Sequence, residues 1–370
     1  MNANREDVKM LNVGILVVGG GPAGMSAALA AAKAGQTVIV CERDENLGGQ
    51  LIKQTHKFFG DVRQCAGKRG FEISKELQEK LSVYPNIEIW TNTVVHGMFQ
   101  DGIVTCEHCG EYIGVKAQKI IMATGASEKF ALFEGNDLPG VYGAGAVQTL
   151  MNVYGIKPAE NVVILGAGNI GLITAYQLEQ AGVHTLAVVE AMDHIGGYEV
   201  HANKLKRMGI PVITKHSIVK AEGNGKVERV QIAALGDNGE FLDETVETYV
   251  CDCVCIAVGL QPLANLCWQS GCKMKYISEL GGYVPVSTEM MRTTKDTLYV
   301  AGDVSGVEEA SAAMLEGEIA GLSAVIDLEK ETDKLESMRN NCVRELIELR
   351  SGPKSEKIRC GLQKLRRQEE

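Results

Sequence analysis

The chain lacks an excess of basic residues, with 37 Lys and Arg against 47 Asp and Glu and a net charge of −10 over 370 residues. This balance argues against nucleic acid or an anionic membrane as the main partner. A long apolar run is also lacking, because the longest apolar stretch, residues 14–32, is interrupted by Gly-Gly-Gly-Pro. We therefore expect no membrane span. The N-terminus has no apolar signal-peptide core, which favours a cytoplasmic protein.

A disulfide framework is not indicated either. The eleven cysteines are odd in number and scattered, and several lie in apolar runs, at positions 41, 251, 253 and 255. Buried thiols in a reducing compartment explain this pattern better than disulfides do. We expect the Cys-Asp-Cys-Val-Cys run to alternate between core and surface positions of one strand rather than to ligate a metal.

Glycine, by contrast, is abundant, with 42 residues, and the first informative cluster is a Gly-x-Gly-x-x-Gly motif at residues 19–24. Apolar residues 15–18 before it predict a buried strand, and small residues predict a helix from about Pro22 to Ala34. A second apolar strand, residues 37–41, ends at Glu42. This order of elements is that of the dinucleotide-binding βαβ unit: a strand, a glycine turn, a helix, and a second strand that ends at an acidic residue.

Each part of this unit has a physical role. Gly19 permits the tight turn, Gly21 lets the backbone approach a pyrophosphate, and Gly24 lets helix and strand pack closely. The helix N-terminus offers N–H groups and partial positive charge to the phosphates. Glu42 can accept hydrogen bonds from ribose hydroxyls.

The same unit occurs again at residues 162–197. Its Gly-x-Gly-x-x-Gly motif, residues 166–171, follows the first by 147 positions, whereas Glu190 follows Glu42 by 148. We therefore place one inserted residue in the second βα loop. Two such units in one chain are very unlikely by chance, so each should hold its own dinucleotide.

Between the copies, residues 68–82 predict a helix, and residues 87–121 predict strands with hairpin turns at residues 100–102 and 109–110. Two further segments form a repeated pair, because residues 119–125 and 250–259 both read as a buried strand that ends at a glycine turn.

Beyond the second copy, the sequence predicts strands at residues 211–214, 227–235 and 298–303, then a small-residue helix at 308–326. The charged tail that follows carries apolar residues at helical spacing, at positions 335, 338, 342, 346 and 349. This stripe would either pack on the core or face another subunit.

With both glycine motifs and the segment LYVAGD in place, residues 13–328 resemble the two-dinucleotide-binding-domain flavoproteins. These are FAD and NAD(P)H oxidoreductases of the thioredoxin-reductase and glutathione-reductase kind, in the pyridine nucleotide-disulfide oxidoreductase-like superfamily. The resemblance implies an α/β fold with two Rossmann-like, three-layer ββα nucleotide-binding domains. An NAD(H)-binding domain, residues 140–260, would be inserted in an FAD-binding domain, residues 1–128 and 262–328, before a charged helical tail, residues 329–370.

The resemblance also implies site residues. Those for FAD are Gly19, Gly21, Pro22, Ala23, Gly24, Glu42, Arg43, Gly49, Gln50, Val94, Thr124, Gly125, Gly302, Asp303, Ala310 and Ser311. Those for NAD are Gly166, Gly168, Asn169, Ile170, Gly171, Glu190 and Gly259. In the first set, Val94 would meet the adenine through its backbone and Asp303 would bind the ribityl chain. The helix start at Ala310 and Ser311 would point N–H groups at the flavin.

The second site favours NAD(H) over NADP(H). No Arg lies between Glu190 and Lys206, and a glutamate repels a 2′-phosphate. Two alternatives stay open: Glu190 as a solvated acid at a strand end, and another adenine nucleotide in place of NAD(H).

The chain departs from these families at both redox positions. Thioredoxin reductases carry a CxxC where residues 140–148 lie, and glutathione-reductase types carry a cysteine pair where residues 48–56 lie. Neither stretch contains cysteine here. Disulfide chemistry needs a thiolate pair against the flavin, so the sequence argues against it.

No catalytic residue is assigned. Gln50, Gln54, His56 and Lys57 are candidates for the flavin face, and for His56 a structural or solvent role is favoured. The one CxxC that exists, at residues 106–109, is better explained as incidental hairpin cysteines than as a partial metal site or a redox pair. No metal site is predicted.

A narrower resemblance rests on residues 48–60, 140–152, 255–272, 279–285 and 301–321. Together these look like α subunits of heteromeric amine and imino-acid dehydrogenases, a group with sarcosine-oxidase-like, opine oxidase, proline or hydroxyproline dehydrogenase and hydrogen cyanide synthase subunits. It implies an FAD-dependent oxidoreductase subunit that exchanges electrons between flavin, NAD(H) and a partner acting on a secondary amine or amino acid.

The partners implied are an FAD-containing β subunit, a small iron–sulfur or other electron-transfer protein, and a small-molecule substrate. The tail has only Cys342 and Cys360, too few for a cluster of its own. Two other functions stay open. One is a free-standing NADH:acceptor flavin reductase or NADH oxidase, and the other is a nucleotide-binding scaffold with a redox-silent second site.

Overall fold

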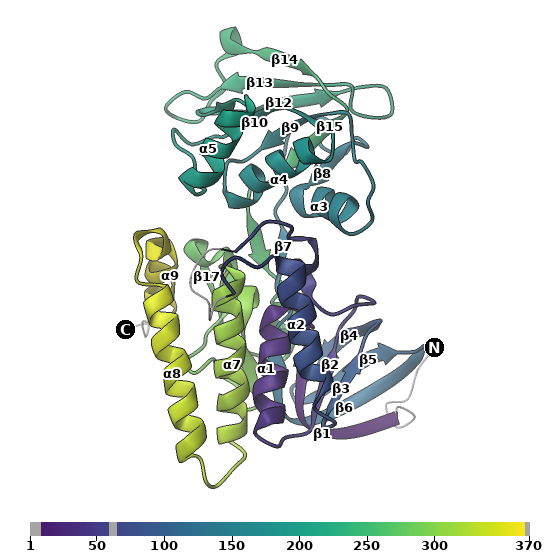
Figure 1. Cartoon of the computed structure of the whole chain (residues 1–370), viewed down its shortest axis with the longest axis vertical. Helices are drawn as coiled ribbons and strands as arrows, with labels where there is room; N and C mark the ends of the chain where they lie inside the picture. The colour runs from purple at the N-terminus through teal and green to yellow at the C-terminus, as the bar shows by residue number, and fades with distance from the viewer. Residues whose placement is uncertain (1–8, 59–64, 367–370) are drawn as a thin grey trace. The chain divides into compact units, whose positions relative to one another are not determined.

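The computed structural model describes residues 9–58 and 65–366, so the predicted outer limits at residues 1 and 370 lie outside the described residues. The chain divides into two compact units (Figure 1). The first contains the residues as far as Ser127 together with those from Gln261 onward, and the second is Glu128–Leu260. Each unit is built on its own parallel sheet.

The sheet of the first unit has the order β3-β2-β1-β6-β5-β4, with β19 paired to β6. Its strands are β1 (Lys9–Val18), β2 (Val38–Cys41), β3 (Ile87–Trp90), β4 (Thr93–Met98), β5 (Ile103–His108), β6 (Glu111–Met122) and β19 (Leu298–Val300). The parallel part joins β3, β2, β1, β6 and β19, whereas β4, β5 and the first half of β6 form an antiparallel meander. The meander turns lie at the two predicted hairpin positions.

Both faces of this parallel sheet are covered. Ile15 and Val17 pack with helices α1 (Pro22–Lys33) and α2 (Gly70–Ser82), while Leu16 and Val18 pack with the meander. A strand buried on both faces reads as a continuous apolar run rather than an alternating one, as residues 15–18 do. The three-layer ββα arrangement expected from the resemblance is thus confirmed.

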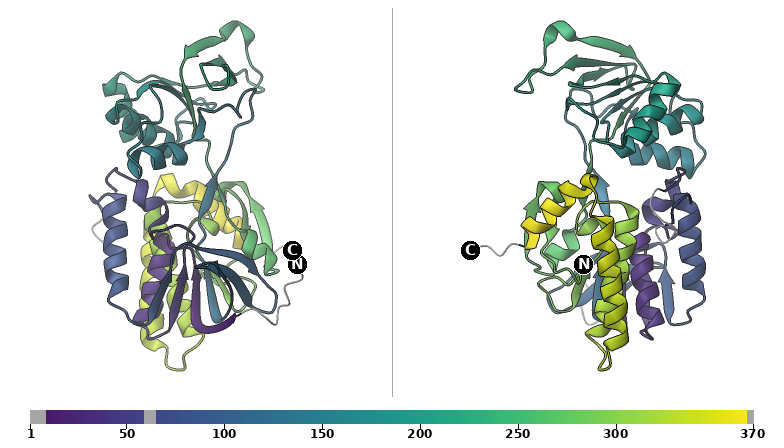
Figure 2. Two further views of the ribbon diagram at one scale, coloured as in Figure 1. Left: turned by 90° about the vertical axis from the view of Figure 1, so that its right-hand side faces the viewer. Right: turned by 60° about the vertical axis from the view of Figure 1, so that its left-hand side comes forward.

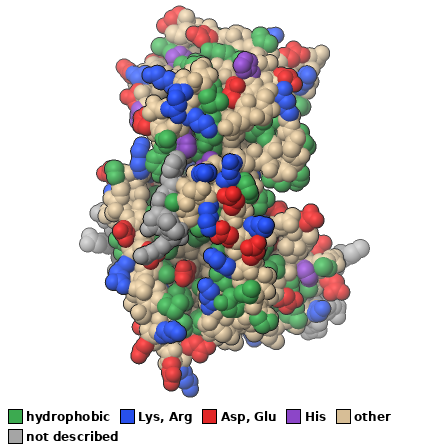
Figure 3. Space-filling view, viewed as in Figure 1, with side chains coloured by type: hydrophobic (Ala, Val, Ile, Leu, Met, Phe, Trp, Pro, Cys, Tyr) green, Lys and Arg blue, Asp and Glu red, His purple; other side chains and the backbone are tan. Residues whose placement is uncertain are grey.

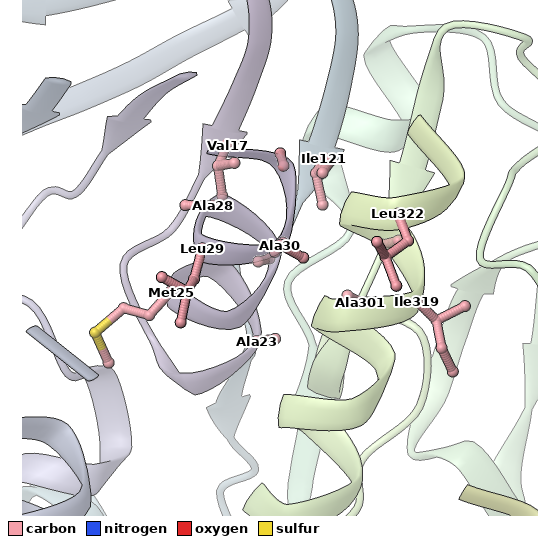
Figure 4. Close-up of a cluster of buried hydrophobic side chains, with 14 of the residues drawn as sticks. Val17, Ala23, Met25, Ala28, Leu29, Ala30, Ile121, Ala301, Ile319 and Leu322 are labelled. Atoms are coloured by element: carbon pink, nitrogen blue, oxygen red, sulfur yellow. The ribbon is translucent and has the colours of Figure 1, made fainter. Parts of the chain in front are cut away.

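Helices α1 and α7 (Ala310–Ile326) pack closely because small residues line the surfaces between them (Figure 4). A Cβ added at Gly317 would lie 2.1 Å from the carbonyl oxygen of Ala23, and one added at Gly321 would lie 2.5 Å from that of Ala27. Only glycine at these two positions lets the helix backbones approach so closely.

The predicted tail stripe packs on the core of the first unit. Helix α8 (Asp333–Leu349) lies beside α7 (Figures 1 and 2), with Cys342 and Leu346 buried in the main cluster. A 3₁₀ turn, η7 (Pro353–Ser355), leads into α9 (Glu356–Arg366). Leu365 of α9 is buried against the segment that holds β17 (Met274–Ile277), η5 (Ser278–Leu280) and β18 (Gly282–Pro285).

The second unit repeats this plan. Its parallel sheet has the order β11-β10-β9-β15-β8, and a second meander has the order β12-β13-β14. The elements are β8 (Val141–Gly143), α3 (Ala144–Asn152), β9 (Asn161–Leu165), α4 (Asn169–Gln180), β10 (His184–Val189), α5 (Glu199–Met208), β11 (Val212–Ile213), β12 (His216–Glu222), β13 (Arg229–Ala234), β14 (Glu247–Val250) and β15 (Cys253–Ile256). Sequence patterns missed β12 and β14, whose residues are largely polar.

The inserted residue of the second copy lies in a strand and not in a loop, which corrects the prediction. The pairing of β9 with β10 shifts register between Thr185 and Ala187, whereas the pairing of β1 with β2 is regular. A β-bulge absorbs one extra residue without changing the flanking pairs. Because of the bulge at Leu186, corresponding residues of the two copies are 147 positions apart before this point and 148 positions apart after it.

The Cys-Asp-Cys-Val-Cys run does not alternate between core and surface, which corrects a second prediction. Cys251, Cys253, Cys255 and Val254 are all buried. Strand β15 lies between β9 and β8, and helices cover one of its faces while the meander covers the other. An internal strand of such a sheet has no solvent face.

None of the helices among the described residues is long and apolar enough to cross a membrane. Acidic and basic side chains are interspersed over the described part of the face shown in Figure 3. This mixture accords with the net charge of −10.

We expect Gly317→Ala to destabilise the first unit by about 1–3 kcal/mol, because the added methyl group would force α7 away from α1. Urea unfolding followed by circular dichroism measures this loss. Gly352→Ala is the matched control, since a Cβ there has no neighbour within 4 Å in the part of the chain that the structure describes. Equal stability of the two variants would contradict the packing argument.

Candidate functional site

The first glycine motif forms the turn between β1 and α1, and the backbone itself requires two of its glycines. Gly19 has a φ of +107°, and a Cβ there would lie 2.3 Å from the carbonyl oxygen of Ala123. A Cβ at Gly24 would lie 1.8 Å from the carbonyl oxygen of Gly19. Both positions are thus explained by the fold alone.

The middle glycine of the motif is different. Gly21 has a φ of −75°, which any residue adopts, and the nearest atom to an added Cβ would be the Cα of Gly49 at 3.9 Å. Gly21 is also the N-cap of α1, where no side chain caps the helix. Neither the backbone conformation nor the packing of the described residues therefore requires glycine at position 21. The lack of a side chain here would let a phosphate group approach the backbone N–H groups at the start of the helix.

Glu42 is fixed at the end of β2, and the carboxylate is buried, with 7% exposure. One oxygen accepts the N–H of Gly20 at 2.7 Å, and the other accepts the N–H of Asp44 at 2.9 Å. A carboxylate has about four acceptor positions, so Glu42 retains capacity for ribose hydroxyls. The contact with Gly20 could not be foreseen from the sequence pattern.

The second motif has the same geometry. Gly166 has a φ of +110°, and a Cβ at Gly171 would lie 2.0 Å from the carbonyl oxygen of Gly166. A Cβ at Gly168 would meet no atom of the described residues within 4 Å. Glu190 accepts the N–H of Ala167 at 2.7 Å and that of Met192 at 3.0 Å. The repeat in sequence is therefore a repeat in hydrogen bonding, which argues that both units are built for a dinucleotide.

The two sites differ in how far the helix N-terminus is covered. Ala23 in α1 is 5% exposed, because Gly302 and Gly317 pack against it. Ile170, the residue 147 positions later in α4, is 38% exposed. At this position the start of α1 is therefore covered, whereas the start of α4 is exposed.

Asp303 lies in the 3₁₀ turn η6 (Gly302–Val304), just after β19. Its Oδ1 accepts the N–H of Glu308 at 3.2 Å. Burial raises the pKa of Asp303 to about 7, and the nearby carboxylates of Glu316 and Glu308 add to this effect. A carboxyl group held in such surroundings suits hydrogen bonding to ligand hydroxyls.

Four further predicted residues of the first site lie on η2, β4 and α7. Gly49 begins the turn η2 (Gly49–Lys53) and lies against Gly21, whose Cα is 3.0 Å from the position of an added Cβ. Val94 is 44% exposed on β4. Ser311, in the first turn of α7, is buried, and Ala310 is half-buried.

Thr124 and Gly125 follow β6. The hydroxyl of Thr124 donates to the carbonyl oxygen of Leu263 at 2.7 Å, and Gly125 has a φ of +73°. Their bonds tie the end of β6 to the segment where the chain re-enters the first unit. Arg43, in contrast, is exposed and pairs with Asp44 at 3.5 Å.

The catalytic candidates lie in η2 and in the segment directly after it. Gln50 is exposed on η2. The ring of His56 stacks on Phe58 with 5.6 Å between centroids, and exposed Lys57 pairs through its backbone with Arg69.

In the second site, the side chain of Asn169 forms a hydrogen bond to the loop that follows β10. Its Oδ1 accepts the N–H of Tyr198 at 2.8 Å, which fixes the Gly196-Gly197 turn beside the helix start. Gly259, which follows β15, has a φ of +108° and accepts the N–H of Lys129 at 2.9 Å.

The cysteines are all free thiols, and those of the CxxC lie in different surroundings. All eleven are outside disulfides. Cys106 is fully buried whereas Cys109 is exposed at the tip of the β5–β6 hairpin, so the CxxC thiols occupy different environments. Within residues 9–58 and 65–366, no group of three or more His, Cys, Asp or Glu residues could hold a metal ion.

The pyridine nucleotide-disulphide oxidoreductase family matches residues 13–317, and the chain belongs to this family. Membership implies binding of FAD and NAD(P), which the geometry of the two glycine turns fits. The family is one of oxidoreductases.

Among relatives, the chain is similar to an opine oxidase subunit of Agrobacterium tumefaciens (strain Ach5), with 28% identity over 85% of this chain and 65% of that protein. It is also similar to hydrogen cyanide synthase subunit HcnB of Pseudomonas aeruginosa, with 24% identity over 86% of this chain and 72% of that protein. The chain thus spans slightly less than two thirds of the length of the first relative. The predicted resemblance to subunits of heteromeric amine-oxidising enzymes is confirmed.

Solved structures give the same result. L-proline dehydrogenase from P. horikoshii matches with a TM-score of 0.67 and 27% identity, over 91% of this chain and 60% of that chain. Thioredoxin reductase from T. acidophilum matches with a TM-score of 0.71 and 24% identity, over 86% of this chain and 99% of that chain. The second likeness is one of fold.

Substitutions in the two motifs should separate packing from ligand binding. We expect Gly24→Ala and Gly171→Ala to lower the free energy of unfolding, because each methyl group would collide with a carbonyl oxygen. Gly21→Ala and Gly168→Ala should leave the ligand-free protein as stable as the parent. Thermal unfolding of the flavin-depleted proteins measures the stability of both pairs of variants. A large loss for Gly21→Ala would show that packing, and not a ligand, explains this glycine.

Proposed function

We propose that this chain is an FAD- and NAD(H)-binding subunit of a heteromeric dehydrogenase that oxidises a secondary amine or an amino acid. FAD would lie in the first unit and NAD(H) in the second. The observation that carries the proposal is the pair of middle glycines, Gly21 and Gly168, each open in front of an uncapped helix N-terminus and each beside a fixed glutamate.

The difference between the sites supports this assignment. A helix start that is covered at Ala23 by α7 suits a cofactor that stays bound, and Asp303 would bind the ribityl chain of that cofactor. An open site, with Ile170 exposed, suits a nucleotide that exchanges during turnover. The flavin would supply the redox chemistry, and the protein would bind it, align it and shield it from water.

Glu190 supports NAD(H) as the second nucleotide. Its carboxylate is held by two backbone N–H groups at the end of β10, where it would meet a ribose 2′-hydroxyl and repel a 2′-phosphate. Lys204, the first Lys or Arg after Glu190 in the sequence, lies over the ring of Tyr176, with 3.5 Å from Nζ to the ring centroid. This contact leaves Glu190 as the charged group best placed for the ribose.

The absence of thiols at both redox positions, residues 48–56 and 140–148, supports electron exchange with a protein and not with a disulfide. The relatives in the comparisons carry subunit names, which favours a second polypeptide as the donor or acceptor. An FAD-containing β subunit, with a small electron-transfer protein, is the partner we propose.

Native purification of a tagged chain from its own cells tests the subunit function. We expect a second flavin-containing polypeptide to copurify, and the complex to reduce an artificial acceptor with a secondary amine or amino acid as donor. A chain that elutes alone, with no amine-dependent activity in the extract it came from, would contradict the proposal.

A free-standing NADH:acceptor reductase is the second candidate, and the complete geometry of the second unit favours it. Anaerobic stopped-flow mixing of the pure chain with NADH, then with oxygen, discriminates between the two. Rapid flavin bleaching and reoxidation without any partner would support the reductase. Absence of flavin bleaching would contradict the free-standing reductase function.

Substitution of each middle glycine by valine should affect one nucleotide only. Gly21→Val should abolish flavin retention, because its side chain would occupy the space that a pyrophosphate needs. Gly168→Val should spare the flavin and weaken NADH binding. Absorbance of the purified proteins and NADH titration measure the two effects, and each variant is the control for the other. Full yellow colour in Gly21→Val would falsify the placement of FAD.

A further inference from the structure

A buried guanidinium lies beneath the turn that carries Asp303. Arg350, the C-cap of α8, is only 7% exposed. Its Nε and Nη2 donate to one oxygen of Glu308 at 2.9 and 2.6 Å, and Nη2 also donates to Glu316 at 2.5 Å. One cation thus holds two carboxylates that lie in sequence on either side of the start of α7.

Glu316 transmits this contact to the turn. Its other oxygen accepts the backbone N–H of Gly302 at 2.9 Å and the hydroxyl of Ser305 at 2.9 Å. Gly302 and Ser305 flank Asp303 and Val304, so one carboxylate ties both sides of η6. A buried carboxylate that accepts several bonds in this way fixes the groups it holds.

Glu308 reaches the same turn from the opposite direction, since its N–H donates to Oδ1 of Asp303. Burial raises the pKa of Glu308, and the bond to Arg350 opposes that rise. Asp303, Glu308 and Glu316 are therefore three clustered carboxyl groups, and Arg350 binds two of them directly. Removal of one partner from a buried charge network leaves the other charges uncompensated.

We propose that Arg350 is a positioning residue of the flavin site, which acts through Glu316 and Glu308 to fix the turn that carries Asp303. The inference rests on the proposed function, because it takes Asp303 as a flavin ligand. Arg350 lies beyond residues 13–317, which match the family, so a segment outside the matched region would complete the site. The matched region alone would not supply this cation.

Two other cations lie near the network. Arg359 of α9 donates to the carbonyl oxygens of Arg350 and Gly352 and so fixes the backbone of the α8–α9 connection. Arg366, also of α9, pairs with Glu289 at 2.8 Å and lies within electrostatic reach of Arg350 and Glu316. Neither forms an ion pair with Glu308 or Glu316 among the described residues, so Arg350 is the cation to remove.

Arg350→Met tests the proposal, with Arg344→Met as the matched control. Arg344 lies on the same helix, is exposed and bonds to Asn341, so its loss removes the same charge without touching the network. We expect FAD affinity of the flavin-depleted full chain, measured by fluorescence titration, to fall by about tenfold or more in Arg350→Met only. Arg350→Lys, which keeps the charge, should recover part of the affinity.

The pH profile separates positioning from a merely structural role. Arg350 opposes the rise that burial causes in the pKa of Glu308, so loss of the cation raises that pKa further. Glu308 then binds a proton as the pH falls, and its repulsion of the neighbouring carboxylates disappears. The affinity defect of Arg350→Met should therefore shrink from about pH 8 to about pH 6. A defect that is the same at every pH, and that Arg350→Lys does not relieve, would overturn the proposal.

Equal FAD affinity in Arg350→Met and Arg344→Met would also overturn it. If Arg350→Met does not fold, the FAD affinity of Ser305→Ala tests the proposal instead. This substitution removes one hydrogen bond between Ser305 and Glu316 but leaves every charge of the network paired. Weaker FAD binding in Ser305→Ala supports the proposal, and unchanged binding contradicts it. Failure of the parent chain to bind FAD would refute the proposed function instead, so the two failures are distinguishable.

Discussion

Each unit depends on contact between backbones at positions where no side chain fits. In the first unit, Gly24 lets the start of α1 reach the carbonyl oxygen of Gly19, and Gly317 lets α7 reach that of Ala23. These contacts bring two helices and the end of β1 together in one place. Because the interior is close-packed, any added Cβ there would displace a whole element and not a side chain. The glycine turn between β1 and α1 is therefore held in position by contacts within the protein, which do not require a bound ligand.

The two copies of the turn share their hydrogen bonds but differ in their surroundings. Glu42 and Glu190 each accept two backbone N–H groups. Ala23 is covered and Ile170 is exposed. The same motif thus has different surroundings in the two units, because the elements that pack on it differ.

Much of the fold could be predicted from the sequence, since strand and helix periods and glycine spacings are local signals. The helix predicted from Pro22 to Ala34 is observed over Pro22–Lys33, and both glycine turns are found where expected. Predictions were wrong where a local pattern has two explanations. The residue inserted before Glu190 is a bulge at Leu186 and not a loop. Val254 is buried together with the cysteines on either side of it because β15 lies between two neighbouring strands.

The sequence by itself determined the two βαβ units, their acids and the lack of redox thiols, because these depend on residues close together in the chain. Only the tertiary structure decided which glycines serve the fold and which are left open, as Gly24 and Gly21 illustrate. It alone brought Arg350 to Glu308, 42 residues away, and to Glu316, 34 residues away. Pairings of this kind arise from the approach of α8 to α7, which no periodicity of a single segment encodes.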